Sequence, residues 1–142
     1  MPKLSTFRTD LDLELSGRWV QFGDEDESGK CIELKIARLG NKNYERQLGT
    51  LKRSDLKKIM RKRGRVDINA LEPYMKEAMS VHVLLDWKNI QDEKGKTIPY
   101  SPEKALELFN DPSLREFYEF VRDEAQDVEE YRAGVAEDSA GN

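Results

Sequence analysis

The side chains that most often carry out catalysis or bind metals are few in this chain. Its 142 residues include one histidine and one cysteine. His82 falls in an apolar helical stripe, where a packed histidine is the favoured interpretation. Cys31 falls in a predicted strand with no cationic neighbour that would clearly lower its pKa, so a buried thiol is the default. One histidine and no Cys-x-x-Cys pair argue against the usual zinc sites. We therefore expect no catalytic residues, no metal and no cofactor.

Two short segments look like ligand-binding motifs but lack the rest of the motif. The run Gly95-Lys96-Thr97 matches the end of a P-loop, which also needs a glycine where Ile90 stands and a helix directly afterwards. The acidic run 24–27 could hold a cation, but it lacks the alternating ligand spacing of an EF-hand, so a solvated turn is favoured. These residues therefore give no support to an enzymatic function.

Composition favours a small, highly charged domain. Charged and hydrophobic residues each make up 37% of the chain, and the net charge is −4. Because globular domains average about 45–50% apolar residues, we expect a thin core. A single cysteine excludes an internal disulfide, and no apolar run approaches the roughly 18 residues of a membrane span. The N-terminal segment lacks the apolar core of a signal peptide, so a reducing cytosol is the expected compartment.

The charges are segregated along the sequence. Residues 52–65 hold eight bases and one acid, whereas residues 116–142 hold nine acids and two bases. These blocks could attract one another, within one subunit or between subunits, or each could face a different partner. On a helical basic face, our candidates for partner binding or self-association are Lys57, Lys58, Arg61 and Lys62. Their acidic counterparts are Glu124, Asp127, Glu129 and Glu130.

The basic block has two other interpretations. It could bind the phosphates of a nucleic acid, but no aromatic residue interleaves with its charges and the whole chain is acidic. It could also be merely a solvated face. We favour a protein partner or another copy over nucleic acid.

The elements that must position these residues follow from periodicity and capping. Residues 18–22 and 31–38 alternate like two strands of a hairpin. Five helices are predicted. The first begins after Asn41, and the second runs from Ser54 to about Gly64 with Leu56, Ile59 and Met60 facing inward. The third covers 68–85, the fourth begins at Ser101-Pro102, and the fifth runs from Asp111-Pro112 to about 128. The expected fold class is mostly α (α+β), with the hairpin at about 18–38 followed by a compact bundle of four to five helices over about 41–131. Residues 1–132 are expected to form one globular domain, and 133–142 a disordered tail.

Trp87 and Tyr100 flank a turn at 92–96 that contains Gly95. The favoured interpretation is that both aromatic side chains hold this turn against the helices. The alternative is a recognition hairpin in which they anchor a partner, as amphipathic aromatic residues often do at interfaces.

A family resemblance covers roughly residues 18–132. It is carried by Trp19, Ile36-Ala37-Arg38, Gly40-Asn41 with Tyr44, Val83-Leu84-Leu85-Asp86-Trp87, Asn89-Ile90, Asp92, Gly95, Ile98-Pro99-Tyr100-Ser101-Pro102-Glu103, Ala105 and Leu108. Its most specific part is the Trp-x-Asn-Ile…Gly…Ile-Pro-Tyr stretch before a helix start. In this order the residues resemble the tail assembly chaperones of long-tailed (siphovirus-type) bacteriophages. None of these residues forms a catalytic signature.

The resemblance implies a role in virion assembly. Chaperones of this family coat the tape measure protein in the host cytoplasm, keep it soluble and help recruit tail tube subunits. They are absent from the mature virion, and many of their genes also yield a longer form by ribosomal frameshifting. We expect this role, a head-to-tail homo-oligomer and no membrane partner. The alternative function is a small nucleic-acid-binding regulator that uses the basic helix 52–65.

Overall fold

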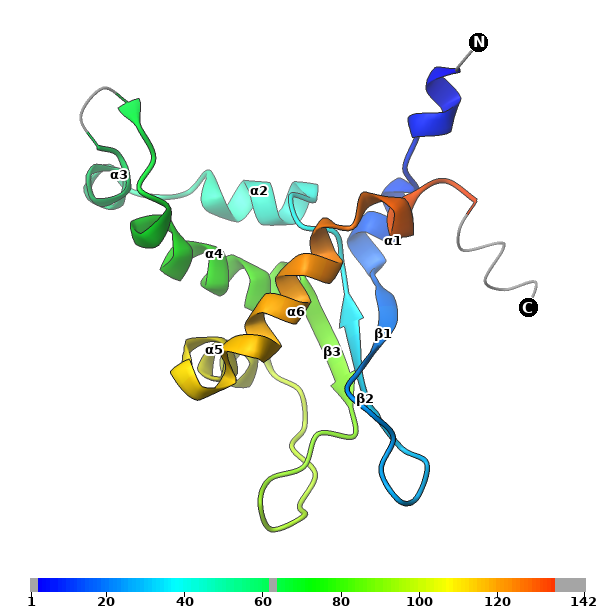
Figure 1. Ribbon diagram of the computed structural model, residues 1–142. Helices are drawn as coiled ribbons and strands as arrows, with labels where there is room; N and C mark the ends of the chain where they lie inside the picture. The colour runs from blue at the N-terminus through cyan, green and yellow to red at the C-terminus, as the bar shows by residue number, and fades with distance from the viewer. Residues whose placement is uncertain (1–2, 62–63, 135–142) are drawn as a thin grey trace.

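Three antiparallel strands form the sheet of the computed structural model, which describes residues 3–61 and 64–134 (Figure 1). β1 (Arg18–Phe22) pairs with β2 (Ile32–Ile36), and β2 pairs with β3 (Leu84–Lys88), in the order β1-β2-β3. The register aligns Val20, Leu34 and Trp87 across the sheet. Because side chains alternate between the two faces of a strand, this row points into the core. The expected hairpin is confirmed.

The third strand corrects the predicted helix at 68–85. α4 (Ile68–His82) ends at His82, and a single residue, Val83, separates it from β3. Leu84 is fully buried and pairs with Ile36 on β2. Two causes end the helix here. Val83 is β-branched and would lose side-chain freedom in a longer helix. Pairing of the next residues with the open edge of β2 also satisfies backbone groups that a helix end would leave without partners. The helices therefore pack against a sheet, and the α+β class is confirmed.

The helices begin largely where local capping predicts. α2 (Lys42–Leu48) starts after Asn41, whose side chain accepts hydrogen bonds from the next turn, and α5 (Pro102–Asn110) starts after Ser101 in the same way. The last predicted helix is split, because a 3-10 turn, η3 (Pro112–Leu114), precedes α6 (Arg115–Gln126). A second 3-10 turn, η4 (Val128–Tyr131), follows α6, and α3 (Arg53–Ile59) lies between α2 and α4.

The core lies where α4, α5 and α6 cover one face of the sheet (Figure 1). Phe109 of α5 packs against Phe117 and Tyr118 of α6, with ring centroids 5.9 and 5.4 Å apart. Tyr131 is fully buried, and its hydroxyl donates a hydrogen bond to the backbone oxygen of Ile36 over 3.0 Å. The segment after α6 is thereby held against β2.

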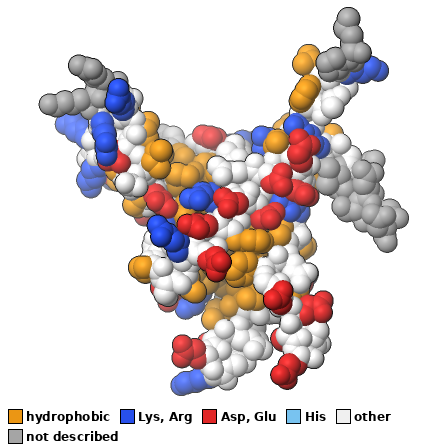
Figure 2. Space-filling model, in the orientation of Figure 1, with side chains coloured by type: hydrophobic (Ala, Val, Ile, Leu, Met, Phe, Trp, Pro, Cys, Tyr) orange, Lys and Arg blue, Asp and Glu red, His pale blue; other side chains and the backbone are white. Residues whose placement is uncertain are grey.

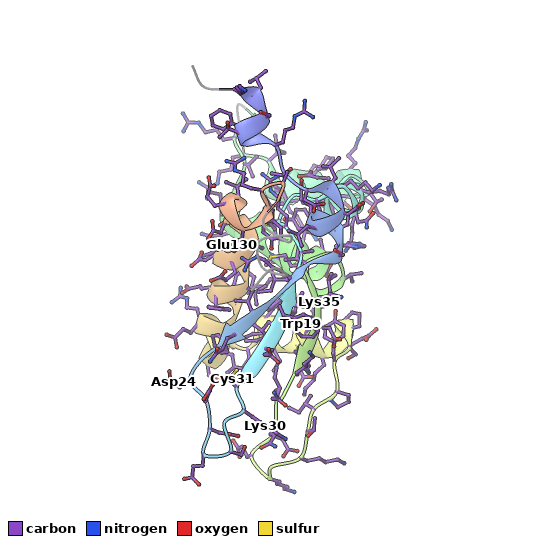
Figure 3. All side chains as sticks on the ribbon, turned by 90° about the vertical axis from the view of Figure 1, so that its right-hand side faces the viewer. Trp19, Asp24, Lys30, Cys31, Lys35 and Glu130 are labelled. Atoms are coloured by element: carbon purple, nitrogen blue, oxygen red, sulfur yellow. The ribbon has the colours of Figure 1, made fainter. Side chains whose placement is uncertain are left out.

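The sheet's other face carries polar side chains and one tryptophan. Trp19, Lys35 and Asp86 are aligned across the three strands on this side, and Figure 3 labels the first two. The Nζ of Lys88 lies 4.0 Å from the centroid of the Trp19 ring. Even with this contact, Trp19 is 38% exposed. Within the described part of the chain, no helix is both long and apolar enough to cross a membrane.

Two short helical elements precede the sheet, where the sequence had suggested none. They are η1 (Leu4–Phe7) and α1 (Leu11–Ser16). We call residues 3–11 the N-terminal arm. Its base is tied to the C-terminal segment, since Asp10 N donates to Tyr131 O over 2.8 Å, and η1 projects away from the body (Figure 1).

Candidate partner-binding surfaces

The predicted basic helix is only partly helical. α3 ends at Ile59, after which Met60 and Val66 pair as an isolated antiparallel bridge. Arg61 N donates to Arg65 O across this loop over 2.6 Å. A helix continued to Gly64 would stack like charges four residues apart, which is destabilising. Our prediction that the basic residues share one helical face is therefore wrong, because Arg61 and Arg65 lie on the loop.

The predicted basic candidates remain on one projection, which we call the basic arm (residues 52–61 and 64–68). Lys57 and Lys58 are exposed, and neither forms an ion pair within the described residues. Arg61 pairs with Asp67 over 3.1 Å. Lys62 lies outside the described residues. The basic arm thus presents uncompensated positive charge to the solvent.

Apolar side chains also face outward from the basic arm. Ile59 alone is buried on α3, whereas the exposed fractions of Leu56, Met60, Val66 and Ile68 are 46%, 43%, 50% and 71%. The prediction that Leu56 and Met60 face inward is wrong. α3 packs mainly on α4, and the exposed fractions of these four side chains show that the described part of the chain leaves the outer side of the arm uncovered. The surface is therefore both basic and apolar.

The four acidic candidates divide into two pairs. Glu124 forms an ion pair with Arg18 over 2.8 Å, and Glu129 pairs with Arg132 over 3.2 Å. Asp127 and Glu130 form no ion pair within residues 3–61 and 64–134. No ion pair between described residues joins the basic arm to α6 or η4. In Figure 1, α3 of the basic arm lies apart from α6 and the segment that follows it. The role of this acidic segment in self-association stays a prediction.

Trp87 and Tyr100 lie within the fold. The Trp87 indole N–H donates to Ile98 O over 2.8 Å, and the two rings meet edge to face at 5.1 Å. The Tyr100 hydroxyl lies 2.6 Å from Leu84 O, and burial raises its pKa to about 12. These contacts support the interpretation that both residues hold the 90–98 turn in place. Because Trp87 is only 5% exposed, contact of its ring with a partner stays a prediction.

An apolar cavity of about 630 Å³ opens between the end of β1, the start of β2, the turn after β3, and α5 with α6. We call it the apolar groove. Figure 2 shows hydrophobic side chains gathered above the two lower projections of the molecule, which carry acidic side chains. Apolar groups lining the groove include Phe22, Ile32, Ile90, Ile98, Leu108 and Phe117. Carboxylates at its rim come from Asp92, Glu93, Asp111 and Glu116, and no lysine or arginine lines it among the described residues.

The groove was missed in the sequence because three distant segments build it. Two rim acids are fixed by local hydrogen bonds. Asp92 Oδ1 accepts from the backbone N–H groups of Lys94 and Lys96 over 2.9 Å, and Asp111 accepts from the hydroxyl and N–H of Ser113. The Ser113 bonds hold the pKa of Asp111 below its usual value, so this carboxylate stays charged. The groove therefore favours apolar groups accompanied by positive charge.

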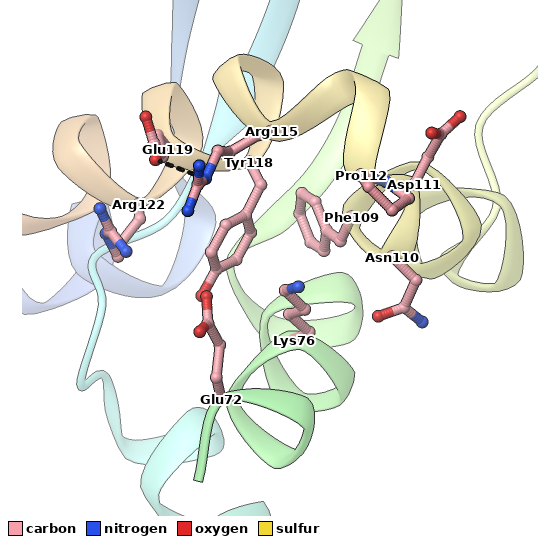
Figure 4. A pocket seen from close by; sticks show the side chains of 10 residues that line it. All are labelled: Glu72, Lys76, Phe109, Asn110, Asp111, Pro112, Arg115, Tyr118, Glu119 and Arg122. Atoms are coloured by element: carbon pink, nitrogen blue, oxygen red, sulfur yellow. Dashed lines mark ion pairs between the residues drawn. The ribbon is translucent and has the colours of Figure 1, made fainter. Parts of the chain in front are cut away.

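A second cavity, of about 530 Å³, lies where α5 and α6 meet α4 (Figure 4). Tyr118 forms its floor, and the Nζ of Lys76 lies 4.8 Å from the centroid of that ring. Three bases and three acids line it: Lys76, Arg115, Arg122, Glu72, Asp111 and Glu119. Because these charges balance, the cavity has no net preference for an anion or a cation.

The histidine and the cysteine show no features of reactive groups. Burial lowers the pKa of His82, and the nearby Arg46 lowers it further. Burial raises the pKa of the half-buried Cys31 thiol, with Glu33 adding to the effect, and a thiol is a poor nucleophile in that state. Among the residues described, no group of three or more His, Cys, Asp and Glu side chains is placed to hold a metal.

Comparison with known proteins gives one relevant result. A family model described as YdaY prophage protein matches residues 39–142. The matched region begins before α2 and includes the basic arm, α4, β3, α5 and α6. No curated protein and no solved structure matches the chain.

Proposed function

We propose that this chain, which belongs to the YdaY prophage protein family, is a phage tail assembly chaperone. In this proposal, many copies coat the tape measure protein in the host cytoplasm, keep it soluble and help recruit tail tube subunits. The copies associate head to tail, leave as the tube polymerises, and are absent from the virion. The activity is non-enzymatic, and a longer frameshifted form belongs to the same proposal.

Large apolar side chains on two projecting arms are the observation that carries this proposal. The N-terminal arm exposes Leu4, Phe7 and Leu11 by 85%, 60% and 72%. The basic arm exposes four more apolar residues at the other side of the molecule (Figure 2). Apolar residues concentrated on projections of a chain that is 37% charged indicate contact with a protein partner.

The N-terminal arm suits an extended helical partner. Arg132 fixes the arm's base, because its Nη1 donates to Phe7 O over 2.6 Å and its guanidinium lies 5.8 Å from the Phe7 ring centroid. The arm can therefore present Leu4 and Phe7 without first having to fold. A tape measure segment exposes apolar helical faces before the tube forms, and the side chains of Leu4 and Phe7 would cover those faces. The charged remainder of each copy keeps the complex soluble.

Co-expression with the tape measure protein of the same phage tests the proposal. We expect the wild-type chain to keep that protein soluble and to co-purify with it. The double variant Leu4→Lys with Phe7→Lys should lose both effects. Val81→Lys is the matched control, since Val81 is 42% exposed on α4 and lies on neither arm. A tape measure protein that stays insoluble beside the wild-type chain would refute the function.

A nucleic-acid-binding regulator is the second candidate, favoured by the exposed Lys57 and Lys58. In that case, the logarithm of the affinity for duplex DNA should fall linearly with the logarithm of the salt concentration, because phosphate contacts release counterions. Lys57→Glu with Lys58→Glu should abolish binding. The absence of any mobility shift at low salt with micromolar protein would remove this candidate.

A further inference from the structure

The apolar groove and the basic arm have complementary chemistry. The groove offers Ile98, Leu108 and Phe117 beneath a rim of four carboxylates. The arm offers outward-facing Leu56 and Met60, and the backbone of Met60 pairs with that of Val66 across the loop. Its described bases are Lys52, Arg53, Lys57, Lys58, Arg61 and Arg65, against the two acids Asp55 and Asp67. An occupant of the groove must supply apolar side chains together with positive charge, and the arm supplies both.

The two surfaces of one molecule do not meet. α3 lies at the upper left of Figure 1, whereas the turn after β3, which lines the groove, lies at the bottom. No ion pair between described residues joins the arm to Asp92, Glu93, Asp111 or Glu116. The arm can therefore reach a groove only on another copy.

We infer that the basic arm of one copy docks in the apolar groove of the next. This inference deepens the head-to-tail association within the proposed function and rests on it. Because two different surfaces meet, each dimer keeps one free arm and one free groove. Copies can then add at both ends and form an open chain. Such a chain is the geometry needed to follow a long partner, and weak individual contacts hold together through avidity.

The N-terminal arm fits the groove less well as an occupant. Its described residues carry only Lys3 and Arg8 as bases, set against Asp10. The acidic segment of η4 is likewise a weaker acceptor than the groove. Glu124 and Glu129 are already paired within the chain, which leaves only Asp127 and Glu130 of the four acidic candidates without an ion pair between described residues. The groove combines an apolar floor with four carboxylates that form no ion pair between described residues.

Charge reversal on each surface tests the contact by sedimentation velocity at low salt. The arm variant is Lys57→Glu with Lys58→Glu, and the groove variant is Glu93→Lys with Glu116→Lys. Each of these four residues is exposed and none is in an ion pair between described residues, so the fold should persist, as circular dichroism will verify. We expect the wild-type chain to form larger species with concentration, and each variant to associate at least about tenfold more weakly.

Mixing the two variants provides the decisive result. One keeps an intact groove and the other an intact arm, so an equimolar mixture should recover a heterodimer that neither variant forms alone. The control, Asp127→Lys with Glu130→Lys, makes the same change of charge on the acidic segment and should associate like the wild type. Loss of association in that control together with retention in the groove variant would overturn the inference.

Two further outcomes separate this inference from the proposed function. A wild-type chain that stays monomeric at every concentration overturns the inference, even if it still keeps the tape measure protein soluble. A groove variant that self-associates normally but loses the tape measure protein also overturns it, because the groove's occupant is then that partner. Failure of the wild-type chain to solubilise the tape measure protein refutes the function without affecting the measured self-association.

Discussion

Replacement of Asn41 by alanine should be among the most destabilising changes of a single polar residue in this chain. The Asn41 side chain is only 3% exposed and makes four hydrogen bonds. Its Oδ1 accepts from the N–H groups of Asn43 and Tyr44, both over 3.0 Å, at the start of α2. Its Nδ2 donates to Arg38 O over 2.8 Å and to His82 O over 3.0 Å. One side chain thus joins the start of α2 to the end of α4.

The expected loss follows from these contacts. The N-cap contribution of asparagine over alanine is typically about 1 kcal/mol. Each carbonyl left without its donor costs about 1 kcal/mol or more when it is buried. Asn41→Ala should therefore lower the free energy of unfolding by about 3 kcal/mol. Asn41→Ser keeps an acceptor for the cap but lacks the two donors, so it should lower that free energy by about 2 kcal/mol.

Urea unfolding followed by far-UV circular dichroism measures both variants against the wild type. The denaturant midpoint should shift while the slope m stays constant, because the surface exposed on unfolding does not change. A loss below about 1 kcal/mol for Asn41→Ala would contradict the assignment of these four bonds. Equal losses for the alanine and serine variants would show that the cap contributes nothing.

Three further predictions concern other contacts of the fold. Trp87→Phe removes the indole donor to Ile98 O and should lower the free energy of unfolding in urea by about 2 kcal/mol, and an unchanged midpoint would contradict the bond. His82 has a folded pKa below its ordinary value near 6.5, so the unfolded chain binds more protons and stability should fall as pH drops below about 7. His82→Gln should reduce the dependence of the melting temperature on pH, and an NMR titration of His82 should give a midpoint below the ordinary value. Gly17 has φ +78°, and an added Cβ would lie 3.0 Å from Ile36 O, so Gly17→Ala should cost about 3 kcal/mol. Gly95→Ala, at φ +79° with open space around it, should cost about 1 kcal/mol; equal losses would contradict the close approach at position 17.

Elements set by neighbouring residues could be predicted from the sequence. Asn41 and Ser101 cap α2 and α5 as expected, because a cap needs only a side-chain oxygen and the N–H groups two or three residues later. The hairpin of β1 and β2 was predicted from alternation alone. The helix end near residue 60 was missed, since repulsion among the bases competes there with helix propensity and the bridge of Met60 with Val66 is the alternative.

The candidate surfaces were predicted less completely. The two charged blocks are a property of the sequence, and they identified Lys57 and Lys58 as exposed charges. That Glu124 is paired with Arg18, 106 residues away in the chain, could not be inferred from spacing. The exposed apolar residues of the N-terminal arm were also missed, because outward and inward leucines look alike when no packing partner is known.

The sequence by itself determined the α+β class, the caps, the charge segregation and the resemblance to phage proteins. Tertiary structure decided where apolar residues are buried. β3 forms because β2 has an open edge beside it, and the groove forms because residues near 22–32, 90–98 and 108–117 meet. Burial and charge pairing depend on contacts between residues far apart in the chain, whereas periodicity and capping report only on neighbours. The acidic-rimmed groove and the basic, apolar arm therefore became visible only in the folded chain.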